Sequence, residues 1–377
     1  MLLARPGDTP KRARHSGSAL GGNSNAGTDA PLGPFSSDLQ LEIRKGLGMN
    51  ILFLGGTGNI STDCGALLQA RGHRIIVLTR GRNPVPAGYT AIVADRHDVK
   101  AVSQALRDLQ VDVVVNFIGF NVPDVAADFE LFAGRVRQYI FISTTVVCAK
   151  PHAKLPLTET SPVGNPFSPY GQGKLACEEW LLSRCREGKF PVTSVRPSHT
   201  YSCRWIPNPV ASSDYTVAAR LEQGKPIFVH DDGQGLWTLT ASSDFAVGLA
   251  GLAGRDDAIG EIFQITGDMV LTWNQICAEI ARALGVAKPK IVHIPTDFIC
   301  AAAPVMIAKL KGDKAEHGVF DNAKIKRFVP DFDCRKSFRQ GIAEAVAWFR
   351  ADSARQTVNP EIDAIFEHVL AKWEKVD

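Results

Sequence analysis

Residues 50–61 read Asn50-Ile51-Leu52-Phe53-Leu54-Gly55-Gly56-Thr57-Gly58-Asn59-Ile60-Ser61, an apolar run followed by a glycine-rich turn. The run is typical of a buried β-strand, and glycines in the turn let a ligand approach the backbone closely. A helix that starts directly after the turn presents unpaired N–H groups and a positive dipole end to an anion. The stretch therefore predicts a strand, a phosphate-binding turn and a helix. The candidate phosphate-binding residues are Gly55, Thr57, Gly58, Asn59 and Ile60.

The alternation of strand and helix continues along the chain. Short β-branched runs, separated by helical stretches, recur at 74–78, 91–94, 111–116, 139–143 and 192–197. Such runs indicate a parallel sheet that is covered on both faces. Right-handed crossovers make this a doubly wound Rossmann fold of the α/β class, with ligands at the carboxyl ends of the strands.

The later sequence predicts a smaller lobe over the sheet. A further strand pattern occurs at 261–265, and Thr272 is a good N-cap for a helix from Trp273 to Leu284 that Gly285 ends. Residues 1–48 are rich in Gly, Ser, Pro and Asn and lack periodicity, which predicts a disordered tail. The expected domains are a nucleotide-binding domain at 49–199 with 237–265 returning to it, a substrate lobe at 200–236 and 266–349, and a C-terminal helical extension at 350–377.

Composition excludes several classes of protein. The 377 residues carry 42 basic and 39 acidic side chains, so the net charge of +3 implies no particular charged partner. Eight scattered cysteines form no Cys-x-x-Cys pair, which predicts reduced thiols and no metal site. No apolar run approaches the roughly 20 residues that a membrane helix needs, so we expect a cytoplasmic protein without a membrane partner.

The end of the second strand bears on the choice of cofactor. A site that prefers NAD usually has an acid there for the ribose 2′-hydroxyl, whereas this sequence has Arg80 and Arg82. Guanidinium groups suit a 2′-phosphate, which favours NADP over NAD; the alternative is that both arginines are solvated loop residues. Asp95, after the third strand, is placed to accept from the adenine amine, and a simple loop acid is the alternative.

A candidate catalytic group follows the fifth strand. Tyr170 and Lys174 are four residues apart, one helical turn, so both side chains can face one cleft. Lys174 and an oxidised nicotinamide would lower the pKa of Tyr170 from about 10 and let it act as acid or base. The hydroxyl residues Ser143-Thr144-Thr145 at the strand end can hydrogen-bond the substrate oxygen, with ordinary strand termination as the alternative.

Strand-end Thr144 with Tyr170 and Lys174 resembles the Ser/Thr, Tyr, Lys triad of the short-chain dehydrogenase/reductase superfamily. The resemblance covers Asn50 to about Phe349 and is closest to the extended branch, which includes NAD-dependent epimerases and dehydratases. The spacing to Val147-Cys148 selects Thr144 over Thr145. The resemblance also implies contacts to the nicotinamide ribose and to the substrate, which it assigns to Phe117, Ile118, Gly119, Lys174, Pro197 and His199.

The resemblance implies hydride transfer to or from a secondary alcohol or ketone, with a sugar or nucleotide sugar among the substrates. Epimerisation and net reduction or oxidation stay open, because one triad serves both. The family arginine that clamps a substrate diphosphate is replaced by Trp237, and a ring cannot replace a bidentate phosphate donor. His199 and Trp237 are the substrate candidates. A homodimer through the stretches near 122–136 and 168–186 is a further expectation from the family.

A second function class stays open. The segments Gly233-Gln234-Gly235, residues 264–268 and residues 321–326 resemble a subgroup that includes the chloroplast stem-loop-binding proteins, which bind RNA. Lysines and an arginine cluster at 309–327, although interspersed acids favour a solvated surface. The alternative is therefore a Rossmann-derived RNA-binding protein with little or no catalysis. A regulator that binds NADP without turnover would have no need for Tyr170 and Lys174.

Overall fold

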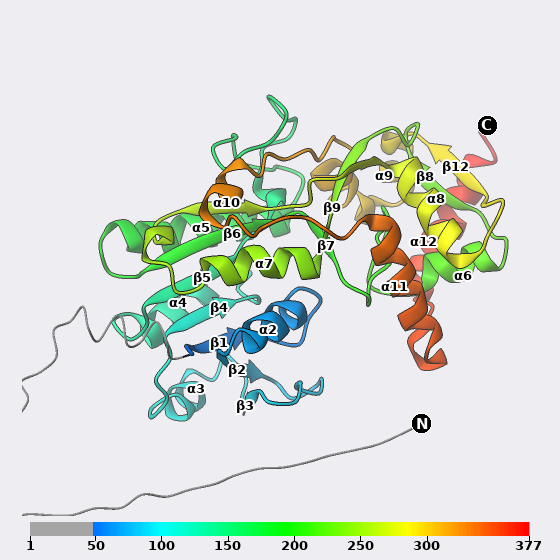
Figure 1. Ribbon diagram of the computed structural model, residues 1–377. Coiled ribbons are helices and arrows are strands. Elements are labelled where there is room, and N and C mark those ends of the chain that lie inside the picture. Colours follow the sequence, from blue (N-terminus) through cyan, green and yellow to red (C-terminus); the bar gives the residue numbers. More distant parts are fainter. Residues whose placement is uncertain (1–47, 377) are drawn as a thin grey trace, which may run out of the picture. The chain divides into compact units, whose positions relative to one another are not determined.

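The computed structural model describes residues 48–376. Its main sheet is parallel throughout and has the order β10-β6-β5-β4-β1-β2-β3 (Figure 1). Its strands are β1 (Asn50–Leu54), β2 (Arg74–Thr79), β3 (Thr90–Val93), β4 (Val113–Asn116), β5 (Gln138–Ile142), β6 (Val192–Pro197) and β10 (Ile262–Ile265). The predicted doubly wound fold is confirmed. The strand order reverses between β1 and β4, which is where such sheets bind ligands.

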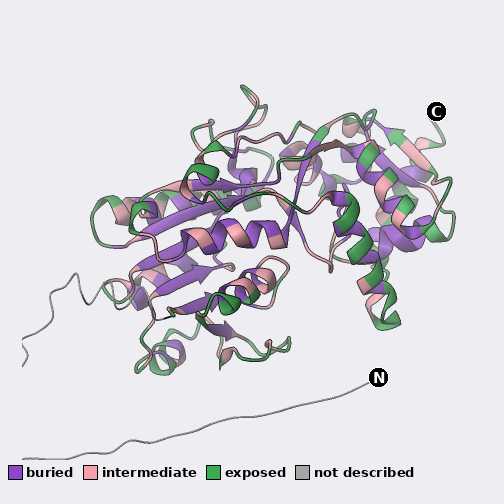
Figure 2. Cartoon of the chain, viewed as in Figure 1, coloured by how far each residue is buried: buried purple, intermediate pink, exposed green. Residues whose placement is uncertain are grey.

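Helices cover both faces of this sheet, as the continuous apolar runs predict. One face packs against α2 (Ser61–Ala70), α7 (Ser242–Leu252) and α10 (Ala323–Phe328). The other packs against α3 (Val99–Ala105), α4 (Val122–Phe132) and α5 (Pro169–Arg186). Figure 2 shows the inner strands and α7 as mostly buried. Burial on both faces removes apolar side chains from water and provides most of the driving force for this layer structure.

A second hydrophobic core lies beyond the main sheet. It is built around two small sheets, one of order β11-β9-β7 and one in which β12 pairs with β8 in parallel. Its strands are β7 (His199–Tyr201), β8 (Ile227–His230), β9 (Leu236–Ala241), β11 (Val270–Thr272) and β12 (Ile291–Ile294). Its helices are α6 (Thr216–Glu222), α8 (Trp273–Leu284), α9 (Thr296–Ala302), α11 (Phe338–Arg350) and α12 (Pro360–Trp373).

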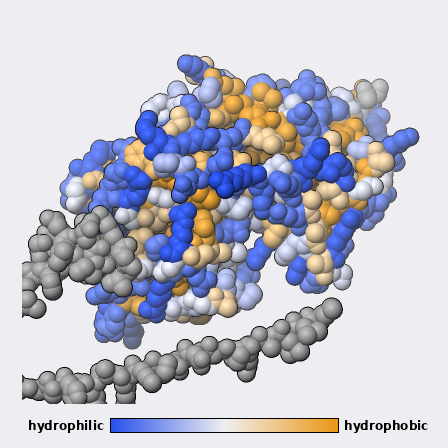
Figure 3. All heavy atoms as spheres, viewed as in Figure 1, coloured by the Kyte–Doolittle hydropathy of each residue, from blue (hydrophilic) through white to orange (hydrophobic). Residues whose placement is uncertain are grey.

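The chain passes between the two cores more than once. β9 pairs with β7 and β11 in the small sheet, and the chain then enters α7, which packs on α2 beside the main sheet. α12 contributes Phe366, Val369 and Leu370 to the second core. On the face drawn in Figure 3, hydrophilic residues cover most of the surface, with smaller hydrophobic areas between them.

Two further sequence expectations concern the N-terminal tail and membrane-spanning helices. The predicted disorder of the N-terminal tail falls outside the described residues. Within residues 48–376 no helix is both long and apolar enough to cross a membrane.

Candidate active site

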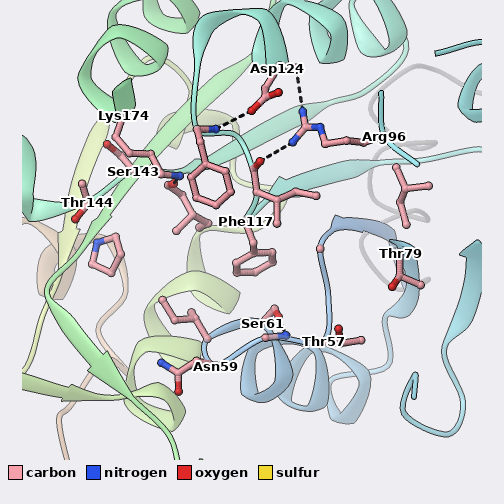
Figure 4. Close-up of a pocket in the computed structure, with 18 of the residues that line it drawn as sticks. Thr57, Asn59, Ser61, Thr79, Arg96, Phe117, Asp124, Ser143, Thr144 and Lys174 are labelled. Carbon is pink, nitrogen blue, oxygen red and sulfur yellow. Dashed lines mark hydrogen bonds between the residues drawn. The ribbon is translucent and has the colours of Figure 1, made fainter. Parts of the chain in front are cut away.

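A cavity of about 880 Å³ opens at the carboxyl ends of the main strands. The glycine-rich turn between β1 and α2 forms one side of it, and the ends of β4, β5 and β6 with the first turns of α5 form the other. In Figure 4, Thr57, Asn59 and Ser61 lie at one edge, Ser143, Thr144 and Lys174 at the opposite edge, and Phe117 between them. All predicted site residues line this cavity except Gly119 and Trp237.

The turn requires glycine at its first position. Gly55 has a φ of +80°, and a Cβ there would lie 2.4 Å from Cγ2 of Ile118. The backbone N–H of Gly58 donates to Ser61 Oγ at 2.9 Å, which fixes the turn at the start of α2. The resulting bare backbone beside a helix N-terminus fits a pyrophosphate, as the dinucleotide-binding motif requires.

Asn59 has a role that the motif alone does not indicate. Its side-chain amide donates to the Thr200 carbonyl at 2.8 Å and accepts from the Ser202 N–H at 2.9 Å. The side chain therefore joins the phosphate-binding turn to the segment that begins at β7. Only its backbone remains for a phosphate contact.

The far end of the cavity carries the residues predicted to surround the adenosine ribose. β2 ends at Thr79, whose hydroxyl accepts from the Gly81 N–H, so no acid occupies this position. Arg80 and Arg82 follow, and both are exposed. A hydrogen bond from the His97 N–H lowers the pKa of Asp95, and the charges of the two arginines lower it further. This end of the cavity suits an anionic substituent such as a 2′-phosphate.

The wall next to β4 is held by Arg96, a residue that sequence reasoning missed and whose side chain is 9% exposed. Arg96 donates to the Ile118 carbonyl at 2.8 Å and to the Asp124 carbonyl at 2.9 Å, and it pairs with the Asp128 carboxylate at 3.0 Å. These bonds orient Phe117 and Ile118 toward the cavity. Gly119 lies behind the wall, where a Cβ would meet Asn116 Nδ2 at 2.9 Å. No local pattern distinguished Arg96 from an exposed loop residue.

Lys174 and Tyr170 come from the first turns of α5, which Ser168 caps by accepting from the Gly171 N–H at 3.1 Å. The Lys174 ammonium is buried and donates to the Ile142 carbonyl at 2.7 Å. It also lies 4.8 Å from the centre of the Phe120 ring. Burial lowers the pKa of Lys174 to about 8.

The pKa of Tyr170 differs from the expectation. Tyr170 is half exposed, and partial burial raises its pKa, while a hydrogen bond with Thr144 opposes the rise. Lys174 does not lower it here, because its amino group points to the Ile142 carbonyl. In this state the phenol is a proton donor at neutral pH. An oxidised nicotinamide in the cavity would add a positive charge that lowers the pKa of Tyr170. The phenol could then accept a proton when an alcohol is oxidised.

Two hydroxyl residues end β5 inside the cavity. Thr144 Oγ1 accepts from the Val146 N–H at 3.2 Å and lies close enough to Tyr170 to lower the pKa of that phenol, whereas Thr145 does not line the cavity. Ser143 also lines the cavity, is only 1% exposed, and its Oγ has no hydrogen-bond partner. A buried hydroxyl without a partner is costly, so Ser143 is suited to bond a ligand.

The two predicted substrate residues lie in contact, but only one of them reaches the cavity. His199 lines it, and Trp237 lies behind His199, 5% exposed, with its ring stacked on Trp273. The Trp237 indole N–H donates to His199 Nδ1 at 3.1 Å. His199 Nε2 then carries the proton of the neutral ring and donates to Ser212 Oγ at 3.1 Å. Burial lowers the pKa of His199 to about 3.

No metal centre is apparent in the described part of the chain. Within residues 48–376, no three or more His, Cys, Asp or Glu side chains are grouped so as to hold a metal ion.

Fold and site together define a protein of the extended short-chain dehydrogenase/reductase class, as the sequence predicted. The model of the NAD dependent epimerase/dehydratase family matches residues 51–266, which is more than half of the chain. The chain belongs to this family. The family match confirms the prediction of an epimerase/dehydratase-type enzyme of the short-chain dehydrogenase/reductase superfamily.

Two similar proteins have names that indicate different functions, one a reductase and one a stem-loop binding protein. A 2'-dehydrokanamycin reductase of Streptomyces kanamyceticus is 26% identical over 291 residues, which cover 76% of this chain and 81% of the relative. The chloroplast stem-loop binding protein of 41 kDa b of Arabidopsis thaliana is 30% identical over 264 residues, covering 66% of this chain and 67% of the relative.

Solved structures show the same fold. The UDP-glucose 4-epimerase of Thermotoga maritima, solved with UDP-glucose, has a TM-score of 0.65 at 20% identity and covers 80% of this chain and 99% of its own. The dTDP-glucose 4,6-dehydratase of Bacillus anthracis, solved with NAD, has a TM-score of 0.63 at 21% identity, with coverages of 81% and 98%.

Proposed function

We propose that the protein transfers hydride between a nicotinamide dinucleotide, NADP in preference to NAD, and a secondary alcohol or ketone. The observation that carries the proposal is the convergence of Thr144, Tyr170 and Lys174 on one cavity with the glycine-rich turn. When bound, the nicotinamide supplies or accepts the hydride at its C4. The turn and the N-terminus of α2 would hold its pyrophosphate.

The side chains then have separate roles. In reduction, the Tyr170 hydroxyl donates its proton to the carbonyl oxygen, and a raised pKa keeps that proton available. Thr144, which lines the cavity beside Tyr170, orients the same oxygen. Lys174 holds the nicotinamide ribose and, with a pKa of about 8, is largely charged at neutral pH. Release of the alcohol after this step gives a reductase. If a bound alcohol is first oxidised to the ketone and the hydride then returns to the other face, the result is epimerisation with no net redox change.

The test of this function is a titration of the wild-type protein and Arg80→Ala with NADP and NAD, followed by calorimetry. We expect NADP to bind more tightly than NAD, and Arg80→Ala to weaken NADP binding by about tenfold, the loss of one charged contact of about 1.4 kcal/mol. Arg107→Ala, an exposed arginine outside the cavity, serves as the control. With cofactor binding established, Tyr170→Phe is the inactive control for substrate screening.

RNA binding is the second candidate, and the stem-loop binding relative is the observation in its favour. The late basic residues that would serve it are mostly engaged. Lys311 pairs with Asp297, Lys324 with Glu261 and Lys326 with Asp268, while Lys309 donates to the Val210 carbonyl. Electrophoretic mobility of a stem-loop RNA tests this candidate. A protein that binds such RNA at physiological salt but neither nucleotide would displace the oxidoreductase proposal.

A further inference from the structure

The charges around Tyr170 restrict what the substrate can carry. A phosphate group in a protein site is ordinarily held by Arg or Lys side chains or by a helix N-terminus. Of the cationic residues that line the cavity, Arg80 and Arg82 lie at the ribose end, and Arg96 is bonded to Asp128 and two carbonyls. Lys174 is bonded to the Ile142 carbonyl beneath the reacting centre. Among residues 48–376, the part of the cavity beside Tyr170 therefore has no cation without a hydrogen-bond partner.

Lysines that approach this region from the second core are engaged as well. Lys314 pairs with Asp313 at 2.7 Å, and Lys309 donates to the Val210 carbonyl at 2.6 Å. Lys150 donates to the Asp313 carbonyl at 3.1 Å. Arg204 is exposed and does not line the cavity.

The His199 side of the cavity is neutral. His199 is fixed as the Nε2–H tautomer between Trp237 and Ser212, so it contributes no positive charge. Asp124 also lines the cavity and accepts from the Phe120 N–H at 3.0 Å. A carboxyl group at this wall offers no donor to a phosphate.

What remains beside Tyr170 is hydroxyl groups and aromatic faces. Ser143 Oγ is buried without a partner and lines the cavity. Ser198 and Thr200 also line it, but their hydroxyls already bond Thr240 and the Ser198 carbonyl. Phe120 is 50% exposed and lies 6.4 Å from the Tyr170 ring, between ring centroids, and Trp205 lines the same region. Hydroxyl groups with apolar ring faces are complementary to the hydroxyls and C–H faces of a carbohydrate-like ring.

We propose that the substrate is a small polyhydroxylated ring without phosphate or nucleotide groups, and that Ser143 bonds a second hydroxyl of this ring beside the reacting carbon. The inference rests on the proposed function and narrows its substrate class. Ser143 thereby becomes a substrate-binding residue in addition to Thr144. Phe120 and Trp205 contact the faces of the ring.

The test uses hexose probes with and without phosphate groups. Protein saturated with the nucleotide that binds best is titrated with D-glucose, D-glucose 6-phosphate and UDP-glucose, and with the corresponding galactose series, by saturation-transfer NMR. We expect the neutral hexoses to bind at least about tenfold more tightly than their phosphorylated partners, since an unpaired phosphate in this region is poorly solvated.

Two variants locate the effect. Ser143→Ala should weaken hexose binding about three- to tenfold, the value of one hydrogen bond, and cofactor affinity is measured in parallel. Trp205→Arg, on a loop and only partly buried, should shift the preference toward D-glucose 6-phosphate by supplying the missing cation.

Three outcomes would overturn the inference: binding of UDP-glucose or D-glucose 6-phosphate as tight as that of glucose, no binding of any neutral hexose up to its solubility limit, or a Ser143→Ala effect confined to the cofactor. Failure of the cofactor titration itself would instead refute the proposed function. The two failures are therefore distinguishable.

Discussion

At the scale of single residues, Gly55 shows how sequence, backbone and site are linked. Its positive φ is a conformation that L side chains adopt at a cost, and the space where a Cβ would sit is occupied by Ile118. The same lack of a side chain brings the backbone to the cavity. Gly72 offers a comparison, because it has a φ of +86° and nothing within 4 Å of a Cβ.

We expect Gly55→Ala to destabilise the protein more than Gly72→Ala. Gly72→Ala carries only the backbone cost of about 1 kcal/mol, whereas Gly55→Ala adds a clash of about 1–3 kcal/mol. Urea unfolding of both variants measures the difference, and calorimetry measures NADP affinity. Equal losses of stability, with cofactor binding retained in Gly55→Ala, would contradict the assignment of this turn.

At the scale of elements, the strands and helices with strong local signals were predictable. The run at 192–197 is β6 with the same bounds, and α8 begins and ends where the Thr272 cap and Gly285 predicted. β7 and β11 have three residues each and pair across long separations, so no periodicity revealed them. The motifs gave positions along the chain and not the direction of side chains. For that reason Gly119 and Trp237 were expected at the cavity, while Arg96 was missed.

Ser168, the N-cap of α5, fixes the first turn of the helix, which carries the proposed proton donor Tyr170. Ser168→Ala removes the acceptor for the Gly171 N–H and should cost about 1 kcal/mol of stability. Ser337→Ala, which removes the cap of α11 away from the cavity, should cost a similar amount. Only Ser168→Ala should also reduce the rate of hydride transfer, because Tyr170 lies in the first turn of α5. Equal rates in both variants, measured by NADPH absorbance, would refute this coupling.

At the scale of the whole molecule, buried neutral histidines make stability depend on pH. Burial lowers the pKa of His230, in the second core beside Trp273, to about 4, and that of His199 to about 3. Each ring binds its proton more readily in the unfolded chain, where the pKa is about 6.5. Each therefore contributes stability that is present above pH of about 6.5 and is lost as the pH falls toward the folded pKa.

We expect His230→Phe to flatten the pH dependence of unfolding below about pH 6.5, where one such histidine contributes a slope of up to about 1.4 kcal/mol per pH unit. The phenyl ring retains the contact with Trp273 and cannot be protonated. Urea unfolding of wild type and variant at about pH 7 and about pH 5 gives the comparison. An unchanged difference between the two pH values would show that His230 is not neutral in the folded protein.

The position of β10 at the edge of the main sheet has a consequence for synthesis on the ribosome. Its neighbour β6 is complete at Pro197, and residues 198–261 have to be translated before β10 begins. At about 5–20 residues per second this takes about 3–13 s. For that time β6, all of whose residues are buried in the finished protein, presents an open strand edge to other nascent chains. Chaperone protection during this interval would then govern the yield of folded protein.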